Sequence, residues 1–297
     1  MSTSTRSTLG LPYQGSKSRI TDKIVELLPA APIFVDVFAG GCAVTHAALL
    51  SGKFGEVIAN DLSDAPQLFY YCAKYGVPEK PSWVSREDFF ALKDRAPLIR
   101  YVYSFGNDGG SYLYGREIEP LKRAAHRAVV DGDYSGLPEP LRGEVAFELN
   151  ALGGAATLHA RRRLFVQVVH AQIARRGGLE CLQRLQHLEH LQRLQRLQHL
   201  QNLARLVTSR RDYHDLYIPD NAVVYCDPPY ANTTGYGIDF DHRAFYAWCR
   251  SVGKRHPLFV SEYWMPSDFR CVAEYEVRAL AGPKAHTQTR VEKIFTI

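Results

Sequence analysis

The chain carries at residues 222–230 the stretch Ala222-Val223-Val224-Tyr225-Cys226-Asp227-Pro228-Pro229-Tyr230. The run at 222–226 is short, β-branched and aromatic, which predicts a buried strand, and the two prolines prevent further ladder pairing. The carboxylate of Asp227 is thereby placed at the carboxyl end of a strand, where ligands bind in open α/β sheets. The stretch therefore predicts an α/β fold with a site at this strand end.

The same residues suit an exocyclic amine on a flat base. Asp227 can accept one N–H of such an amine, the carbonyl of Pro228 can accept the other, and Tyr230 can stack on the ring. Held in this way, the amine nitrogen would direct its lone pair toward an electrophile. The alternative interpretation is a strand-end turn with an incidental acid.

Residues 224–230 resemble the catalytic loop of the Dam-like (alpha-group, phage and bacterial type) DNA adenine-N6 methyltransferases. The resemblance implies S-adenosylmethionine as methyl donor, double-stranded DNA as partner, base flipping, and a catalytic set of Asp227, Pro228, Pro229 and Tyr230. The implied fold is an α/β, Rossmann-like S-adenosylmethionine-dependent methyltransferase sandwich with a mostly helical inserted domain. The loop alone also resembles amino-methyltransferases acting on RNA or a protein amide, and a non-catalytic DNA-binding relative is a further alternative.

Composition is that of an ordinary globular chain. With 297 residues, 46% hydrophobic and 23% charged, it can bury a full core in one large domain or one domain with an insert. No apolar run long enough for a membrane span or a signal peptide occurs, so a cytoplasmic location is expected. The six cysteines show no Cys-x-x-Cys spacing, so neither a disulfide framework nor a zinc site is expected.

A second motif suggests a nucleotide-like ligand. Residues 33–38 read as a buried strand, Ala39-Gly40-Gly41 as a tight turn, and residues 43–50 as a helix. A further strand at 57–60 ends at Asp61, about twenty residues on, where an acid can hold ribose hydroxyls. Asp61 is therefore the predicted ribose ligand, and a βαβ unit with no ligand is the alternative.

The resemblance extends to both sides of this motif. The N-terminal loop looks like the family segment in which an aromatic, a glycine and a lysine lie beside the cofactor, and residues 36–41 look like the family's cofactor loop. An acidic-aromatic pair follows at 212–213, where the resemblance implies that Asp212 accepts the amino group of the cofactor adenine. The implied cofactor-binding residues are Tyr13, Gly15, Lys17, Asp36, Phe38, Ala39, Gly40, Gly41, Asp61, Asp212 and Tyr213.

These assignments have alternatives in the residues alone. Gly-Ser-Lys at 15–17 is also a routine turn, and Asp212, which follows two arginines, is equally typical of a surface ion pair. Cys42 departs from the family pattern, in which another glycine or a small residue is common. This departure affects only the fine geometry of the loop.

Prolines 78 and 81 mark a change of domain. The expected organisation is a discontinuous catalytic domain at 1–75 and 207–297 around an inserted target-recognition and DNA-binding domain at 76–206. The insert holds nineteen Lys or Arg against fourteen Asp or Glu, while both flanking parts are balanced. A basic middle is typical of a polyanion-binding segment, although so small an excess is also common on plain surfaces.

Three features of the insert are open to interpretation. Asn107, Tyr112 and Tyr114 lie in an Asn-Asp-Gly-Gly hairpin or loop that could face DNA, or whose aromatic rings could pack against its own helices. Arg161, Arg162 and Arg163 on a helix at 158–176 could contact phosphates or form a solvated face. The Leu-x-x repeat at 182–206 fits a helix buried on several sides, a three-per-turn element or a short stack.

Beyond the catalytic loop, residues 231–241 suggest a lid.

Overall fold

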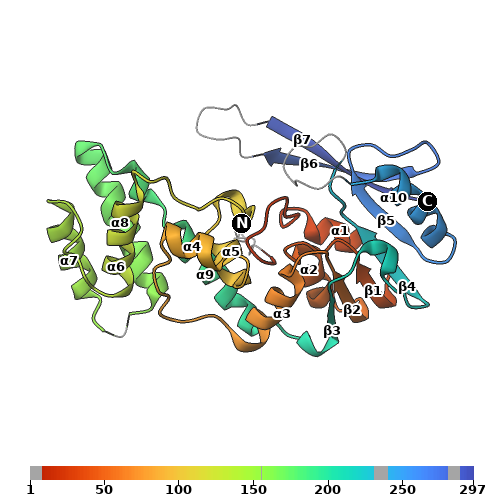
Figure 1. Ribbon diagram of the computed structural model, residues 1–297, viewed down its shortest axis with the longest axis horizontal. Coiled ribbons are helices and arrows are strands. Elements are labelled where there is room, and N and C mark those ends of the chain that lie inside the picture. The colour runs from red at the N-terminus through yellow and green to blue at the C-terminus, as the bar shows by residue number, and fades with distance from the viewer. Residues whose placement is uncertain (1–8, 155, 231–239, 280–287) are drawn as a thin grey trace, which may run out of the picture. The chain divides into compact units, whose positions relative to one another are not determined.

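The computed structural model describes residues 9–154, 156–230, 240–279 and 288–297 (Figure 1). It divides into two compact units, of which the first comprises Met1–Leu11, Gly15–Lys74 and His199–Ile297 and the second Pro12–Gln14 and Tyr75–Gln198. Residues 231–239, which make up most of the expected lid, lie outside the described residues.

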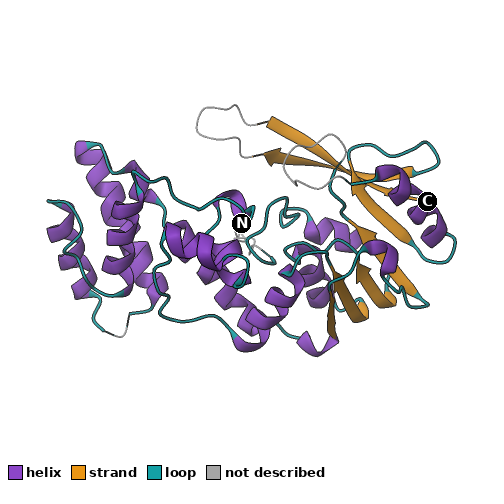
Figure 2. Ribbon diagram, in the orientation of Figure 1, coloured by secondary structure: helices purple, strands orange, loops and turns teal. Residues whose placement is uncertain are grey.

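The first unit is an α/β structure (Figure 2). Its elements are α1 (Thr21–Leu27), β1 (Ala31–Asp36), α2 (Ala43–Ser51), β2 (Phe54–Asn60), α3 (Ala65–Tyr75), η4 (Leu203–Arg205), β3 (Leu206–Ser209), η5 (Tyr213–Asp215), β4 (Ala222–Cys226), α10 (His242–Gly253), β5 (Leu258–Glu262), β6 (Arg270–Ala279) and β7 (Gln288–Thr296), where η marks a 3-10 helix.

The seven strands form one sheet in the order β3-β2-β1-β4-β5-β7-β6. The first five in this order pair in parallel, whereas β7 is antiparallel to both β5 and β6. Strand order reverses between β1 and β4, which is the type of position where doubly wound sheets bind ligands. The parallel strands place their carboxyl ends at one edge, and this edge carries the candidate site.

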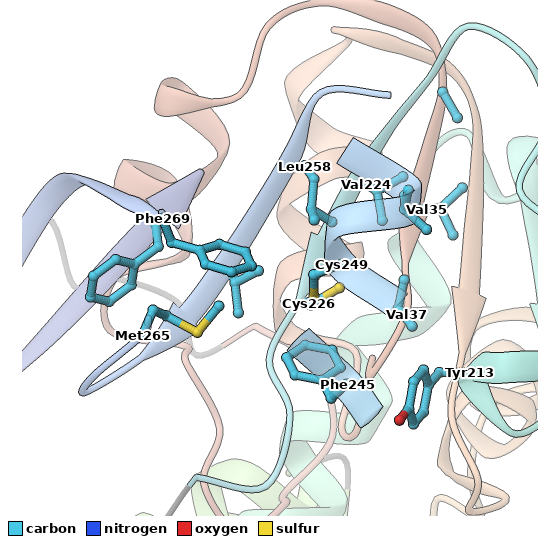
Figure 3. Packing of buried hydrophobic residues seen from close by; sticks show 14 residues of the cluster. Val35, Val37, Tyr213, Val224, Cys226, Phe245, Cys249, Leu258, Met265 and Phe269 are labelled. Carbon is cyan, nitrogen blue, oxygen red and sulfur yellow. The ribbon is translucent and has the colours of Figure 1, made fainter. Parts of the chain in front are cut away.

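Alternating residues of the central strands face two different layers. Val35 and Val37 belong to a buried cluster with Val224, Cys226 and the α10 residue Phe245 (Figure 3). On the opposite side of β1, Phe34 stacks on Phe54, and Asp36 bonds Thr45 of α2. The central strands are therefore covered on both faces, which explains why they read as continuous apolar runs.

The second unit is helical in the described residues. Its elements are α4 (Arg86–Leu92), α5 (Pro97–Val102), η1 (Phe105–Asn107), α6 (Glu119–Val130), α7 (Leu141–Ala151), α8 (Leu158–Arg176), η2 (Glu180–Gln183), α9 (Gln186–Gln195) and η3 (Arg196–His199), the last of which ends one residue beyond the unit. Thr157 caps the start of α8 by accepting the N–H of Ala160, and the helix stops at Gly177, as the sequence predicts.

The Leu-x-x repeat combines two kinds of helix. Successive leucines three residues apart drift about 60° around an α-helix, so the three in α9 span one face of this short helix. The flanking 3-10 segments, with three residues per turn, return the next leucines to the interior. Six consecutive leucines of the repeat are buried: Leu182, Leu185, Leu188, Leu191, Leu194 and Leu197.

No helix in the described parts of the chain is long and apolar enough to span a bilayer.

Candidate active site

Acidic residues occupy the carboxyl ends of four neighbouring parallel strands. Asp36 ends β1, Asp61 follows β2, Asp212 follows β3 and Asp227 follows β4. Asn60 ties three of these strand ends together, because its amide donates to the carbonyls of Val37 (3.1 Å) and Arg211 (3.0 Å). The sheet thus brings together acids that are far apart in the sequence.

The candidate catalytic loop at 227–230 contacts Lys17. The ammonium of Lys17 lies 2.8 Å from Oδ1 of Asp227 and 4.5 Å from the centroid of the Tyr230 ring. The side chains of Lys17 and Asp227 are only 10% and 18% exposed. The resemblance implied a place for Lys17 beside the cofactor, and the structure puts its charge on the carboxylate of the catalytic loop.

Oδ1 of Asp227 is a buried acceptor. The Lys17 ammonium lies 2.8 Å away and balances its charge, although this contact does not have the angles of a good hydrogen bond. Burial raises the pKa of Asp227 and Glu292 raises it further, whereas Lys17 lowers it. A buried acceptor held by so imperfect a contact can receive an N–H from a ligand.

Asp61 connects the glycine turn to the end of β2. Its Oδ2 accepts the N–H of Gly40 at 2.8 Å, and its Oδ1 accepts the N–H of Ser63 at 2.8 Å. Each carboxylate oxygen has a second lone pair, so the half-buried Asp61 can still accept ribose hydroxyls. Its geometry fits the role of a ribose ligand beside a backbone loop.

Asp36 is buried and engaged within the fold. Its Oδ2 accepts the N–H (3.1 Å) and the hydroxyl (2.7 Å) of Thr45 in α2. Burial raises the pKa of Asp36 from 3.8 to about 7, Thr45 opposes the shift, and Asp227 and Asp61 add to it. Asp36 therefore anchors the end of β1 to α2, and the residue is only 1% exposed.

This carboxylate predicts a pH-dependent stability. Between about pH 4 and pH 7 the unfolded chain loses the Asp36 proton while the folded chain keeps it, so the free energy of unfolding should fall as pH rises. Asp36→Asn keeps an acceptor oxygen for Thr45 and should remove up to about 1.4 kcal/mol per pH unit of this dependence. Urea denaturation between pH 4.5 and 8 measures it, with the exposed Asp215→Asn as control. Parallel curves for wild type and Asp36→Asn would contradict the assignment.

After β3 the chain carries an exposed acid, Asp212, next to a buried aromatic residue, Tyr213. Asp212 is exposed, and its Oδ1 accepts both the N–H (2.9 Å) and Nδ1–H (2.8 Å) of His214, which leaves Oδ2 for a ligand amine. Tyr213 is buried, and its ring lies 5.4 Å from that of Phe38. Tyr213 and Phe38 therefore form an aromatic wall in the core beneath this strand end.

Some other residues that the resemblance places beside the cofactor matter for their backbone conformation, and Tyr13 belongs to the second unit. Gly15 and Gly40 both have positive φ angles, 73° and 46°. Cys42 is left-handed as well, with φ 59°, a conformation that glycine adopts without strain. Tyr13 falls in the second unit, where its ring lies 5.5 Å from that of Tyr101.

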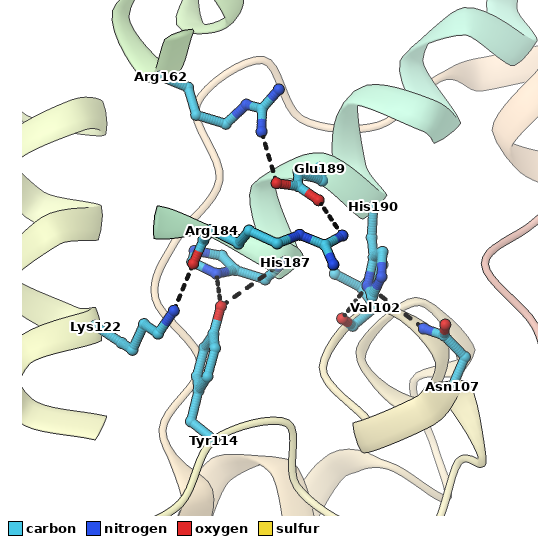
Figure 4. Close-up of polar contacts among 9 residues, drawn as sticks. All are labelled: Val102, Asn107, Tyr114, Lys122, Arg162, Arg184, His187, Glu189 and His190. Carbon is cyan, nitrogen blue, oxygen red and sulfur yellow. Dashed lines mark hydrogen bonds and ion pairs between the residues drawn. The ribbon is translucent and has the colours of Figure 1, made fainter. Parts of the chain in front are cut away.

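Tyr112 and Tyr114 do not face solvent, so the DNA-facing interpretation is corrected for both. Tyr112 is 5% and Tyr114 2% exposed. The hydroxyl of Tyr112 donates to the carbonyl of Val84 at 2.8 Å, and that of Tyr114 lies 2.6 Å from Nδ1 of His187 (Figure 4). The structure thus supports the alternative in which these rings pack their own loop.

Two of the three clustered arginines stabilise the helical unit. Arg161 donates to the carbonyls of Val129 and Ala128 at the end of α6, and Arg162 pairs with Glu189 of α9 at 3.0 Å (Figure 4). Arg163 is exposed, as a phosphate contact requires. Asn107 donates to the carbonyl of Tyr101 at 2.9 Å and so shapes its own loop.

Glu292 of β7 also belongs to the cluster around Lys17 and Asp227, although no sequence pattern predicted it. Its Oε2 accepts the hydroxyl of Tyr230 at 2.7 Å and lies 3.7 Å from Nζ of Lys17. Burial raises the pKa of Tyr230 well above its ordinary value, so this hydroxyl stays protonated and donates. No sequence signal marks Glu292, because an acid in an alternating strand is ordinary.

Metal chemistry has no obvious ligand set here. Within residues 9–154, 156–230, 240–279 and 288–297, no group of three or more His, Cys, Asp or Glu side chains is placed to hold a metal ion. The six cysteines are free thiols.

The seven-stranded, mostly parallel sheet, with acids at its carboxyl edge, is compatible with a Rossmann-like methyltransferase fold. The model of the D12 class N6 adenine-specific DNA methyltransferase family matches residues 13–79. This match confirms the resemblance to Dam-like adenine methyltransferases and supports an adenine-specific DNA methyltransferase activity. The matched segment contains the glycine turn and Asp61 and ends before the catalytic loop. No curated protein matches the chain.

Proposed function

We propose that this protein transfers a methyl group from S-adenosylmethionine to the N6 amine of adenine in double-stranded DNA, acting on an adenine flipped out of the duplex. One observation carries the proposal. The buried carboxylate of Asp227, which contacts the Lys17 ammonium at 2.8 Å, lies in the loop that also holds the carbonyl of Pro228 and the ring of Tyr230. These groups match two N–H donors and the face of one base.

The residues at the neighbouring strand ends fit the cofactor. Asp61 and Asp212 each keep acceptor capacity, for the ribose hydroxyls and the adenine amine respectively, and the turn at Gly40-Gly41 lets a ligand approach the backbone closely. When bound, S-adenosylmethionine supplies an electrophilic methyl group on a sulfonium. The chain therefore has no leaving group to activate.

The proposed role of the protein is to align the target amine with the methyl group of the cofactor. Asp227 accepts one N–H of the target amine and the Pro228 carbonyl the other, which fixes the direction of the nitrogen lone pair. Tyr230 replaces the stacking that the base loses when it leaves the duplex. Lys17 lies against the oxygen that the amine is proposed to use, so we expect the ammonium to move away from Asp227 as the amine enters.

The second unit is proposed to carry DNA affinity and target choice. Its support is the basic excess of residues 76–206 and the exposure of Arg163. Arg161, Arg162, Tyr112 and Tyr114 have partners inside the unit and are not needed for this role.

The proposal is tested by incubating the purified chain with S-adenosylmethionine carrying a labelled methyl group. Separate reactions contain duplex DNA, RNA or a protein mixture, and the products are digested and identified by mass spectrometry. We expect label in N6-methyladenine from DNA, and calorimetry should show cofactor binding that Asp61→Ala weakens. Label only in RNA or protein would favour the other amino-methyltransferase classes. DNA binding without any transfer by folded protein would indicate a non-catalytic relative.

A further inference from the structure

Glu292 reaches the catalytic loop because of the direction of β7. Antiparallel pairing with β5 sets Lys293 opposite Glu262, so the preceding residues of β7 lie at the edge where β4 and β5 end. The Glu292 side chain is 12% exposed. A nearly buried carboxylate here requires partners, and it has two, Tyr230 and Lys17.

The first partner is the Tyr230 hydroxyl. Glu292 accepts it at 2.7 Å, while the edge of the Tyr263 ring meets the Tyr230 ring at 4.7 Å between centroids and 80° between planes. A ring held at its hydroxyl and at one side keeps a fixed plane. This plane determines where a stacked base lies.

The second partner is Lys17. Its ammonium lies 2.8 Å from Asp227 and 3.7 Å from Glu292, and over the Tyr230 ring. It therefore occupies the position of an N–H donor between Asp227 and an aromatic face, as the target amine is proposed to do. When the amine displaces Lys17 from Asp227, Glu292 is the carboxylate already beside the ammonium.

We propose that Glu292 is a positioning residue for the target base, fixing the plane of Tyr230 and receiving Lys17 when the amine binds Asp227. The inference rests on the proposed function and extends it to a residue that touches neither cofactor nor base. It separates two tasks: Asp227 orients the amine, and Glu292 orients the groups around it.

The test compares Glu292→Ala with Glu292→Gln, which keeps an acceptor for the Tyr230 hydroxyl but removes the charge that Lys17 needs. We expect Glu292→Ala to lower the single-turnover methylation rate about 10- to 100-fold, the range of one charge-assisted hydrogen bond, and Glu292→Gln to lower it less. Cofactor and DNA dissociation constants should stay within about twofold, because the proposal places neither ligand against Glu292. The exposed Glu276→Gln on β6 is the matched control.

A second measurement separates positioning from general destabilisation. In a Tyr230→Phe background, where the hydroxyl is absent, Glu292→Ala should slow the reaction by a smaller factor than in wild type. Equal factors in both backgrounds, or methylation by Glu292→Ala within twofold of an active wild type, would overturn the inference and leave the proposed function standing. An inactive wild type would overturn both.

Discussion

Asp227→Ala is expected to reduce single-turnover methylation of adenine in duplex DNA by about 10²–10³-fold, the usual effect of removing one preorganised polar contact to the reacting group. The carboxylate is assigned to the target amine, so affinity for S-adenosylmethionine should change by no more than about twofold. Lys17 keeps Glu292 as a partner, which limits the cost of leaving its charge buried. Rapid-quench kinetics with enzyme in excess measure the rate, and calorimetry measures the cofactor.

Asp227→Asn refines this expectation. The amide oxygen can still accept an N–H, whereas the charge is lost, so its rate should lie between those of wild type and Asp227→Ala. The exposed Asp220→Asn is the control for an acid-to-amide change. A near-wild-type single-turnover rate for Asp227→Ala would exclude the proposed mechanism.

Gly10→Ala is expected to destabilise the first unit by about 3 kcal/mol or more. Gly10 has φ +71°, and a Cβ there would lie 2.4 Å from the carbonyl oxygen of Gly41 and 2.7 Å from the amide of Ala43. Both are backbone atoms, so neither can swing away. The neighbouring N–H of Leu11 donates to the same Gly41 carbonyl at 2.7 Å, so the clash should also distort the glycine turn and weaken cofactor binding.

Gly52→Ala is a matched control for this prediction. Gly52 has nearly the same angle, φ +69°, but a Cβ there meets nothing within 4 Å. Gly52→Ala should lower the free energy of unfolding only by the cost of a left-handed alanine, about 1–2 kcal/mol. Urea denaturation of both variants measures the difference, and similar losses would show that sterics at Gly10 contribute nothing.

The strands and turns of the sheet were predictable because their signals are local. The strand at 222–226 is observed as β4, and the helix predicted at 158–176 is observed as α8. Residues 83–98 have a pattern typical of one helix, but the structure forms α4 and α5 there, with Pro97 starting the second. A proline at the first helical position marks a start as readily as a break.

The parts that escaped prediction depend on distant partners. Whether Tyr112 and Tyr114 face DNA or the interior is decided by Val84 and His187, which no local pattern connects to them. Glu292 joined the site through the register of two antiparallel strands. The ligand roles of Asp61 and Asp212 stay predictions, although the sheet brings both to the expected edge.

The charge cluster of Lys17, Asp227 and Glu292 also bears on how the protein becomes active during folding. Its members lie on three segments that are distant along the chain and meet only when β4, β5 and β7 have paired. Proteins dominated by contacts of long sequence separation fold slowly, because loop closure must precede such contacts. A growing chain that has already folded its cofactor strands would therefore still lack the cluster. On the proposed function, methyl transfer would return only after the pairing of β4, β5 and β7 has assembled this cluster.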